Sequence, residues 1–183
     1  MKAFRDVTSE DSDMLFEWRN KPEVSAYMYT DHAITRSEHD AWFSRMADNQ
    51  TRRYWILVVD GRDVGLVNLA DIDMHDQRCS WAFYIAESEL RGRGVGAFAE
   101  FEALRYVFEE LKLNKLCCEV LGFNAAVQKM HGRFGFTHEG TLRQHRIKNG
   151  EFHDVEVFGM LRDEWEQNRN ELEADLKRKR VFE

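Results

Sequence analysis

The pattern that most constrains the fold is a set of strand-like segments followed by a glycine-rich turn and a long amphipathic helix. Three such segments precede the turn, at residues 54–59, 64–72 and 77–86. Asp60-Gly61 between the first two is a strong hairpin signal, so we expect an antiparallel meander. The turn, Arg91 to Gly96, leads into apolar residues that recur every three or four positions as far as Leu111, which indicates a helix.

The remaining segments predict an α+β domain. Four further strands are expected at residues 2–7, 115–121, 136–147 and 152–161, the last two flanking the hairpin signal Asn149-Gly150. Helices are expected from Met14 to Asn20, after a capping box formed by Thr35 and Glu38, and after Asn124. The stretch 23–34 has no clear periodicity. The fold class is therefore α+β, a single mixed, mostly antiparallel sheet of about seven strands flanked by about four helices.

Length and charge favour one domain with an appendage. The chain has 183 residues, enough for one domain, which we expect over residues 1–165. Residues 166–183 form a highly charged C-terminal tail, which we interpret as a peripheral, frayed helix.

Composition excludes several classes of protein. The 26 Lys and Arg against 33 Asp and Glu give a net charge of −7, which argues against a nucleic-acid partner. No apolar run approaches the ~20 residues that span a bilayer, so no membrane partner is expected. Three cysteines, with Cys117 and Cys118 adjacent and pointing to opposite faces of a strand, indicate reduced thiols and a cytoplasmic location. No Cys/His spacing suggests a metal site.

The glycine-rich turn carries the clearest chemical signal. Its three glycines allow positive φ and close approach of a ligand, and its N–H groups stand at a helix N-terminus, which favours anions. The turn therefore predicts a pyrophosphate site. A P-loop would end in Gly-Lys-Ser/Thr, whereas Gly96-Ala97-Phe98 stands here, and a dinucleotide fold places its glycine loop after the first strand. A tight turn without a ligand stays an open alternative.

Two motifs carry a resemblance to a known family. Arg91, Gly94 and Gly96 match the loop of motif A in the GNAT acetyltransferase superfamily, and Asn124 followed by Gly135-Phe136 matches a later one. The order of elements is also similar. The resemblance implies acetyl-CoA as co-substrate and two splayed parallel strands, around Tyr84 and Glu119, with the thioester between them. The implied cofactor-binding residues are Ile85, Arg91, Gly92, Arg93, Gly94, Val95, Gly96 and Asn124.

The N-terminal half resembles a narrower branch. Glu17 to Asn20, Tyr27 to Thr30 and Trp42-Phe43, together with Lys148 to Asp154, are similar to N-acetyltransferases of the pseudaminic-acid pathway, which serve flagellin modification. These acetylate the 4-amino group of a UDP-linked 4-amino-4,6-dideoxy sugar. The resemblance implies that Arg19 and His39 contact the nucleotide. It also implies an apolar wall against the sugar, made of Met28, Tyr29, Trp42 and Tyr84.

The implied catalytic residues are Glu119 and His131. A neutral amine attacks a thioester directly, so positioning supplies much of the rate and no Ser or Cys nucleophile is needed. A backbone N–H between Phe83 and Ile85 polarises the carbonyl, and Glu119 takes the proton of the amine. His131 stands where many members of the superfamily have the Tyr that protonates the leaving thiolate. Either His131 takes that role or the thiolate leaves without a dedicated acid.

Plainer interpretations stay open for each of these residues. His131 lies on the apolar stripe of its helix and fits a core histidine; Arg19 and His39 fit surface residues; Met28, Tyr29 and Trp42 fit a core.

The function as a whole also has alternatives. A polyamine or protein N-terminal acetyltransferase shares the domain, and so does a non-catalytic acyl-CoA-binding module. A small-molecule UDP-amino-sugar is the expected partner, and a homodimer stays open.

Overall fold

A computed structural model describes residues 1–46 and 49–182 as one sheet with helices on both faces. The sheet has seven strands in the order β1-β2-β3-β4-β5-β7-β6. Their bounds are β1 (Lys2–Asp6), β2 (Arg53–Val59), β3 (Arg62–Asp73), β4 (Arg78–Ile85), β5 (Lys115–Leu121), β6 (Thr137–Lys148) and β7 (Glu151–Leu161). Five of the six neighbouring pairs are antiparallel and β4–β5 is parallel. The predicted mixed, mostly antiparallel sheet of seven strands is confirmed.

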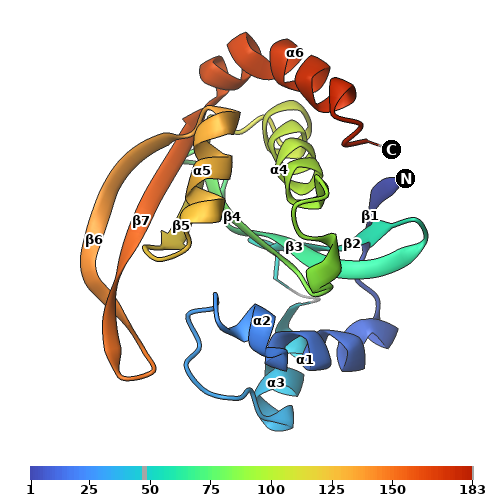
Figure 1. Cartoon of the computed structure of the whole chain (residues 1–183), viewed down its shortest axis with the longest axis vertical. Coiled ribbons are helices and arrows are strands. Elements are labelled where there is room, and N and C mark those ends of the chain that lie inside the picture. Colours follow the sequence, from blue (N-terminus) through green and yellow to red (C-terminus); the bar gives the residue numbers. More distant parts are fainter. Residues whose placement is uncertain (47–48, 183) are drawn as a thin grey trace.

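The helices divide between the two faces of the sheet (Figure 1). On one side lie α1 (Ser12–Asn20), α2 (Pro22–Ser25) and α3 (Arg36–Met46); on the other lie α4 (Val95–Arg105), α5 (Ala125–Phe134) and α6 (Arg162–Arg178). A π-helical turn, Tyr106–Glu110, extends α4. Helix α2 falls in a stretch expected to be irregular. It has four residues, too few for a periodic pattern, and Pro22 at its first position was the signal for it.

Each face of the sheet has its own apolar cluster. The larger one joins Trp81 of β4 and Cys118 of β5 to α4, α5 and α6. The smaller one joins Tyr84 of β4 to Leu15 and Trp18 of α1. Because neighbouring residues of a strand point to opposite faces, β4 contributes to both clusters. The sheet therefore separates two apolar clusters, and no side chain belongs to both.

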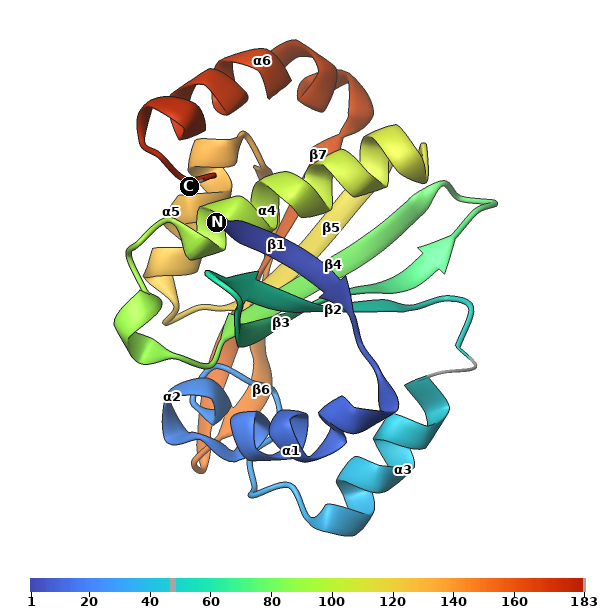
Figure 2. The ribbon, with the colours of Figure 1, turned by 90° about the vertical axis from the view of Figure 1, so that its right-hand side faces the viewer.

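The C-terminal segment is part of the core, not a peripheral, frayed helix. Trp165, Leu176 and Val181 are each 5% exposed or less, and the Phe182 ring lies 5.3 Å from that of Phe101. The boundary expected after residue 165 falls inside α6, which begins at Arg162. Most charged residues of the segment are exposed, while its few apolar residues join the cluster that contains α4. Figure 2 shows α6 lying beside α4.

Strands β4 and β5 part after three residue pairs. Arg78 to Ser80 pair with Lys115 to Cys117, and no pairing across β4–β5 follows in this part of the chain. We call residues 81–85 and 118–121 the strand fork. Each arm keeps its outer neighbour, since β4 pairs with β3 as far as Ile85 and β5 pairs with β7 as far as Leu121. The splayed parallel pair that the family resemblance implied is therefore present.

Gly65 allows β3 to approach the β4 arm of the strand fork. A Cβ at Gly65 would lie 2.2 Å from the carbonyl oxygen of Tyr84, a backbone atom that cannot move aside alone. We expect Gly65→Ala to lower the free energy of unfolding by about 1–3 kcal/mol, as overpacking does. Urea unfolding followed by circular dichroism measures it.

Gly132→Ala is the matched control. A Cβ at Gly132 meets nothing within 4 Å, and the residue lies inside α5. Ala is a better helix former than Gly by about 1 kcal/mol, so this variant should be at least as stable as the wild type. A Gly65→Ala protein as stable as the wild type would contradict the close approach.

Candidate functional site

The glycine-rich loop runs from Arg91 to Gly96 and opens α4. Gly92 and Gly94 have φ of 77° and 78°, and Gly94 is the N-cap of α4. A Cβ at Gly94 would lie 3.1 Å from the Val181 side chain, and one at Gly96 would lie 3.3 Å from the Met130 sulfur. The first N–H groups of a helix have no acceptor within it, so those at the start of α4 are available to an anion.

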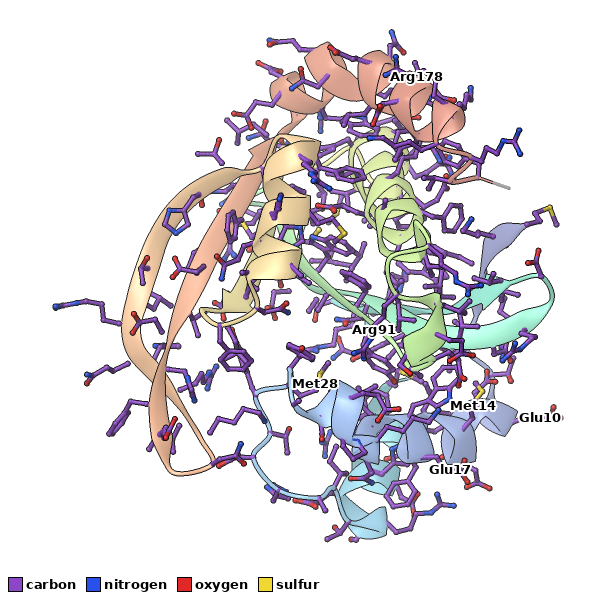
Figure 3. The ribbon with its side chains drawn as sticks, in the orientation of Figure 1. Glu10, Met14, Glu17, Met28, Arg91 and Arg178 are labelled. Atoms are coloured by element: carbon purple, nitrogen blue, oxygen red, sulfur yellow. The ribbon has the colours of Figure 1, made fainter. Side chains whose placement is uncertain are left out.

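Two arginines give this loop a positive charge. The Arg91 guanidinium donates to the carbonyls of Glu23, at 2.7 Å, and Ile85, at 3.4 Å. Arg91 and Arg93 are exposed, and neither forms an ion pair with a carboxylate in the described part of the chain. Figure 3 shows Arg91 near Met28, where the helices of the two sides approach. The charge and the free N–H groups are the features that the predicted pyrophosphate site requires.

The two faces of the strand fork carry different side chains. Phe83 and Ile85 pack on the side of α4 and α5, whereas Tyr84 packs on the side of α1. Glu119 alternates with buried Cys118 and is exposed, where its Oε2 accepts the Tyr29 hydroxyl at 2.7 Å. Burial and this hydrogen bond raise the pKa of Tyr29, so its hydroxyl stays protonated. Glu119 and Tyr84 therefore belong to the α1–α3 side, opposite the glycine-rich loop's helix.

The β6–β7 hairpin holds the loop that carries Tyr29. The Arg146 guanidinium lies 4.1 Å from the centre of the Tyr29 ring. The Lys148 ammonium is buried and donates to the carbonyls of Met28, at 3.0 Å, and Thr30, at 3.1 Å. Sequence reasoning did not single out Arg146 or Lys148 as site residues. The one sequence signal for them was the family resemblance of residues 148–154. The contact itself could not be predicted, because the hairpin and this loop lie about 120 residues apart in the sequence.

Arg19 is a half-buried cation without a described counter-ion. Its Nη2 lies 3.5 Å from the Thr30 hydroxyl, and no carboxylate in residues 1–46 or 49–182 pairs with it. Burial lowers its pKa. The nearby Tyr84 hydroxyl is buried and has no hydrogen-bond partner within the described residues. An unneutralised guanidinium beside an unpartnered hydroxyl is suited to an anionic or polar ligand.

His131 of α5 forms a buried pair with Glu100 of α4. The distance from Nδ1 of His131 to Oε1 of Glu100 is 2.6 Å, and the two residues are 2% and 0% exposed. Burial raises the pKa of Glu100. Glu100 was not expected as a site residue. The signal was a carboxylate inside the apolar stripe of its helix, beside Phe98 and Phe101.

Two expected substrate residues lie elsewhere. His39 is 2% exposed and its Nε2 lies 3.1 Å from the Ser12 hydroxyl, so it joins α3 to α1. Burial lowers its pKa. Trp42 lines a hollow of about 310 Å³ with Arg45 and Tyr54, and Tyr54 lies two strands away from β4. The structure places Arg19 near Tyr84 and joins Tyr29 to Glu119. Trp42 packs against the same apolar cluster as Tyr84 and Met28, whereas His39 lies between α1 and α3.

Cys79, Cys117 and Cys118 are free thiols, and burial raises the pKa of Cys79 to about 12. Residues 1–46 and 49–182 hold no cluster of three metal-ligating side chains. None of the described helices is long and apolar enough to cross a membrane.

A mixed sheet whose parallel strands part beside a glycine-rich helix start is the architecture of acyl-CoA-dependent acetyltransferases. The chain belongs to the acetyltransferase (GNAT) domain family, which matches residues 3–137. It is an N-acetyltransferase by that membership and by the names of its relatives, and the enzymes of this family use acetyl-CoA.

Three similar proteins each match most of the chain. Acetyltransferase PseH of Campylobacter jejuni is 27% identical over 75% of this chain and 83% of its own. Spermidine N(1)-acetyltransferase of Escherichia coli is 25% identical over 82% of this chain and 81% of its own. The solved spermidine N-acetyltransferase of Vibrio cholerae, in complex with CoA and spermine, superposes with a TM-score of 0.83 at 21% identity, covering 90% and 97% of the two chains. The fold is thus shared with a solved spermidine acetyltransferase.

The two hydrogen bonds by which Lys148 holds residues 28–30 can be tested directly. Lys148→Met removes two hydrogen bonds from a charged donor, each worth about 1.5–3 kcal/mol. We expect amide exchange in residues 27–31 to accelerate by about tenfold or more. Hydrogen–deuterium exchange with mass spectrometry measures it, with peptides of β2 and β3 unchanged.

Arg143→Met on the same strand is the control. Arg143 is exposed, so this variant should leave exchange in residues 27–31 as in the wild type. Equal exchange in the Lys148→Met and wild-type proteins would show that the hairpin does not hold the loop.

Proposed function

We propose that this protein transfers the acetyl group of acetyl-CoA to the 4-amino group of a UDP-linked 4-amino-4,6-dideoxy sugar, in the biosynthesis of a nonulosonic acid such as pseudaminic acid. The observation that carries the proposal is the guanidinium of Arg19, which has no described carboxylate partner. It lies on the α1–α3 side of the strand fork, which we call the acceptor side because the amine would bind there. A nucleotide sugar brings a pyrophosphate, and Arg binds phosphate oxygens with charge-assisted, bidentate hydrogen bonds. The resemblance of the N-terminal segments and the PseH relatives support the same substrate class.

The charges on the acceptor side distinguish this substrate from a polyamine. Arg19 and Arg146 both lack a described carboxylate partner. Glu119, an exposed carboxylate on the same side, already accepts a hydrogen bond from the Tyr29 hydroxyl. The charge of Asp31 is directed to the Asn149 N–H and to Lys148. A polycation would meet two arginines there, which costs free energy, whereas a diphosphate would neutralise them.

The residues at the glycine-rich loop fit acetyl-CoA, which supplies an activated acetyl group as a thioester. The anion site formed by Arg91, Gly92, Arg93, Gly94, Val95 and Gly96 would hold its pyrophosphate. A Cβ at Gly94 or Gly96 would press on Val181 or Met130, so the two glycines let the loop and the start of α4 keep this backbone path. Ile85, at the end of the β4 arm, and Asn124, at the start of α5, complete the set of residues proposed to bind it.

The chain's own residues then perform three tasks. The β4 arm of the fork offers backbone N–H groups near Phe83 and Ile85 that polarise a carbonyl. Glu119, on the acceptor side, takes the proton that the amine loses, with the Tyr29 hydroxyl keeping the carboxylate in place. His131, on the other side, protonates the leaving sulfur.

Met28, Tyr29 and Tyr84 form the wall against the sugar. His39 and Trp42, both on α3, have no direct contact with the substrate in this proposal; they only pack α3 against the rest of the domain.

A bulky side chain in the glycine-rich loop should block acetyl-CoA. Gly94→Trp strains a position with positive φ and presses its side chain against Val181, which displaces the start of α4 and removes at least two charge-assisted hydrogen bonds of about 1.5–3 kcal/mol each. We expect CoA affinity to fall by about a hundredfold or more. Isothermal titration calorimetry with CoA measures it.

Gly61→Trp is the control, because Gly61 has almost the same φ as Gly94 and receives the same new side chain. Gly61 has φ of 77° in the β2–β3 hairpin, with open space around it. Its CoA affinity should stay at the wild-type value. If Gly94→Trp binds CoA as the wild type does, the loop is not the pyrophosphate site.

The acceptor is tested by the release of free CoA thiol from acetyl-CoA. We expect turnover with the UDP-linked 4-amino-4,6-dideoxy sugar and none with spermidine or with peptide N-termini. Arg19→Met should raise the KM for the sugar by about tenfold or more, through loss of a charged hydrogen bond, with little change in kcat.

Arg45→Met, which removes an exposed arginine of α3, is the control and should leave KM unchanged. Turnover of spermidine without turnover of the nucleotide sugar would overturn the proposal and identify a polyamine enzyme. Binding of CoA without turnover of any amine would identify a non-catalytic module.

A further inference from the structure

The Glu100–His131 pair is the most unusual buried group in the described part of the chain. Glu100 is fully buried in α4, and its described partner is Nδ1 of His131; its second oxygen, Oε2, has none. A carboxylate in such a place costs several kcal/mol unless it is neutralised. A pair that only filled space would be replaced at little cost by apolar side chains, so its presence calls for a chemical reason.

The pair lies where the strand fork begins. The His131 ring lies 5.7 Å from the ring of Trp81 and 5.7 Å from that of Phe158. Trp81 is the first residue of β4 after the last β4–β5 pair. Phe158 pairs with Cys118, which is the first residue of β5 after that pair. The imidazole therefore lies at the base of the fork, on the side of α4 and α5.

The contacts limit the protonation state of the ring. With Nδ1 held by Glu100, Nε2 is the nitrogen left for another partner. In an apolar site the pair is most stable with no net charge on either group, which places one proton on the carboxyl, donated to Nδ1, and the other on Nε2. Burial, and next the nearby Glu100, raise the pKa of Cys118 of β5 well above the ordinary value, so this thiol stays neutral beside the pair.

We propose that Glu100 is a positioning residue, which holds His131 as the Nε2-protonated tautomer at the base of the strand fork and supplies the proton that replaces the one His131 gives up. This inference rests on the proposed acetyl transfer, in which His131 protonates the leaving sulfur. It adds a residue of α4 to a role that one residue of α5 would otherwise fill alone.

The proton movements balance. The amine nitrogen forms a bond to the carbonyl carbon and the carbon–sulfur bond breaks, while Glu119 takes the proton that the amine loses. His131 gives its Nε2 proton to the sulfur, and Glu100 passes its carboxyl proton to Nδ1. The pair is left as a carboxylate and the opposite tautomer of a neutral imidazole. A proton from solvent restores Nε2, and the Nδ1 proton returns to Glu100.

The tautomer is tested first, on the free protein. Long-range proton–nitrogen NMR of protein labelled with ¹⁵N-histidine distinguishes the two tautomers, and a His131→Tyr sample assigns the resonance. We expect His131 to be the Nε2–H tautomer, with a hydrogen-bonded Nδ1 that loses this bond in Glu100→Leu. An Nδ1–H tautomer or a charged imidazolium in the wild type overturns the proposal.

Steady-state kinetics with the amine that the protein acetylates tests whether Glu100 contributes to the rate. Glu100→Leu should lower kcat by about tenfold to a hundredfold, part of the usual contribution of general acid catalysis, with an unchanged dissociation constant for CoA. Glu100→Gln keeps a donor to Nδ1 but cannot pass on a proton. It should retain more of kcat than Glu100→Leu and show a shifted pH profile of kcat.

Rescue and control variants separate positioning from folding. Glu100→Leu/His131→Tyr places at residue 131 an acid that needs no carboxylate behind it, so its kcat should rise above that of Glu100→Leu. His138 and Glu156 form an exposed pair with the same 2.6 Å separation, and Glu156→Gln should leave kcat unchanged. Wild-type kcat in Glu100→Leu overturns the proposal. If no amine is acetylated, the proposed function fails, and the tautomer measurement still decides the state of the pair.

Discussion

The parting of β4 and β5 is the constraint on which the rest of the structure depends. Beyond Ser80 and Cys117 the two strands no longer pair with each other, yet each keeps its outer neighbour in the sheet. Backbone groups on the inner edges are therefore left for a ligand, in a place where the sheet itself stays rigid. The fork also joins two compartments. The anion site of α4 and the His131–Glu100 pair lie on one side, and Arg19, Tyr29 and Glu119 lie on the other.

Long-range contacts hold both sides of the fork in place. Val181, near the end of the chain, packs against Gly94 at the start of α4, so α6 supports the glycine-rich loop. On the acceptor side, Lys148 of the β6–β7 hairpin binds the backbone on both sides of Tyr29. Net charge is a poor guide to such a site. The chain carries −7 overall, yet two arginines, Arg19 and Arg146, lie on this side without a described carboxylate partner.

Local patterns were enough for most of the elements. The hairpins at Asp60-Gly61 and Asn149-Gly150 and the capping box of Thr35 and Glu38 are formed by residues close in sequence, and the structure contains all three. The positive φ at Gly94 likewise follows from a local requirement. The helix α2 and the docking of α6 were missed, because the first is too short for a period and the second depends on a surface of α4 that the tail's own sequence does not describe.

What the sequence determined by itself is most of the strands, the two hairpins and the glycine-rich start of α4, because each depends on periodicity or turn chemistry within a few residues; the parallel pair followed from the family resemblance, and the anion site stays a prediction. What only the tertiary structure decided is the surroundings of each ionisable side chain. His39 and His131 look alike in sequence, each on the apolar stripe of a helix, yet one binds a serine hydroxyl between two helices and the other a buried carboxylate at the strand fork. Burial and partners come from segments distant in sequence, and they set the charge and the chemistry of a histidine.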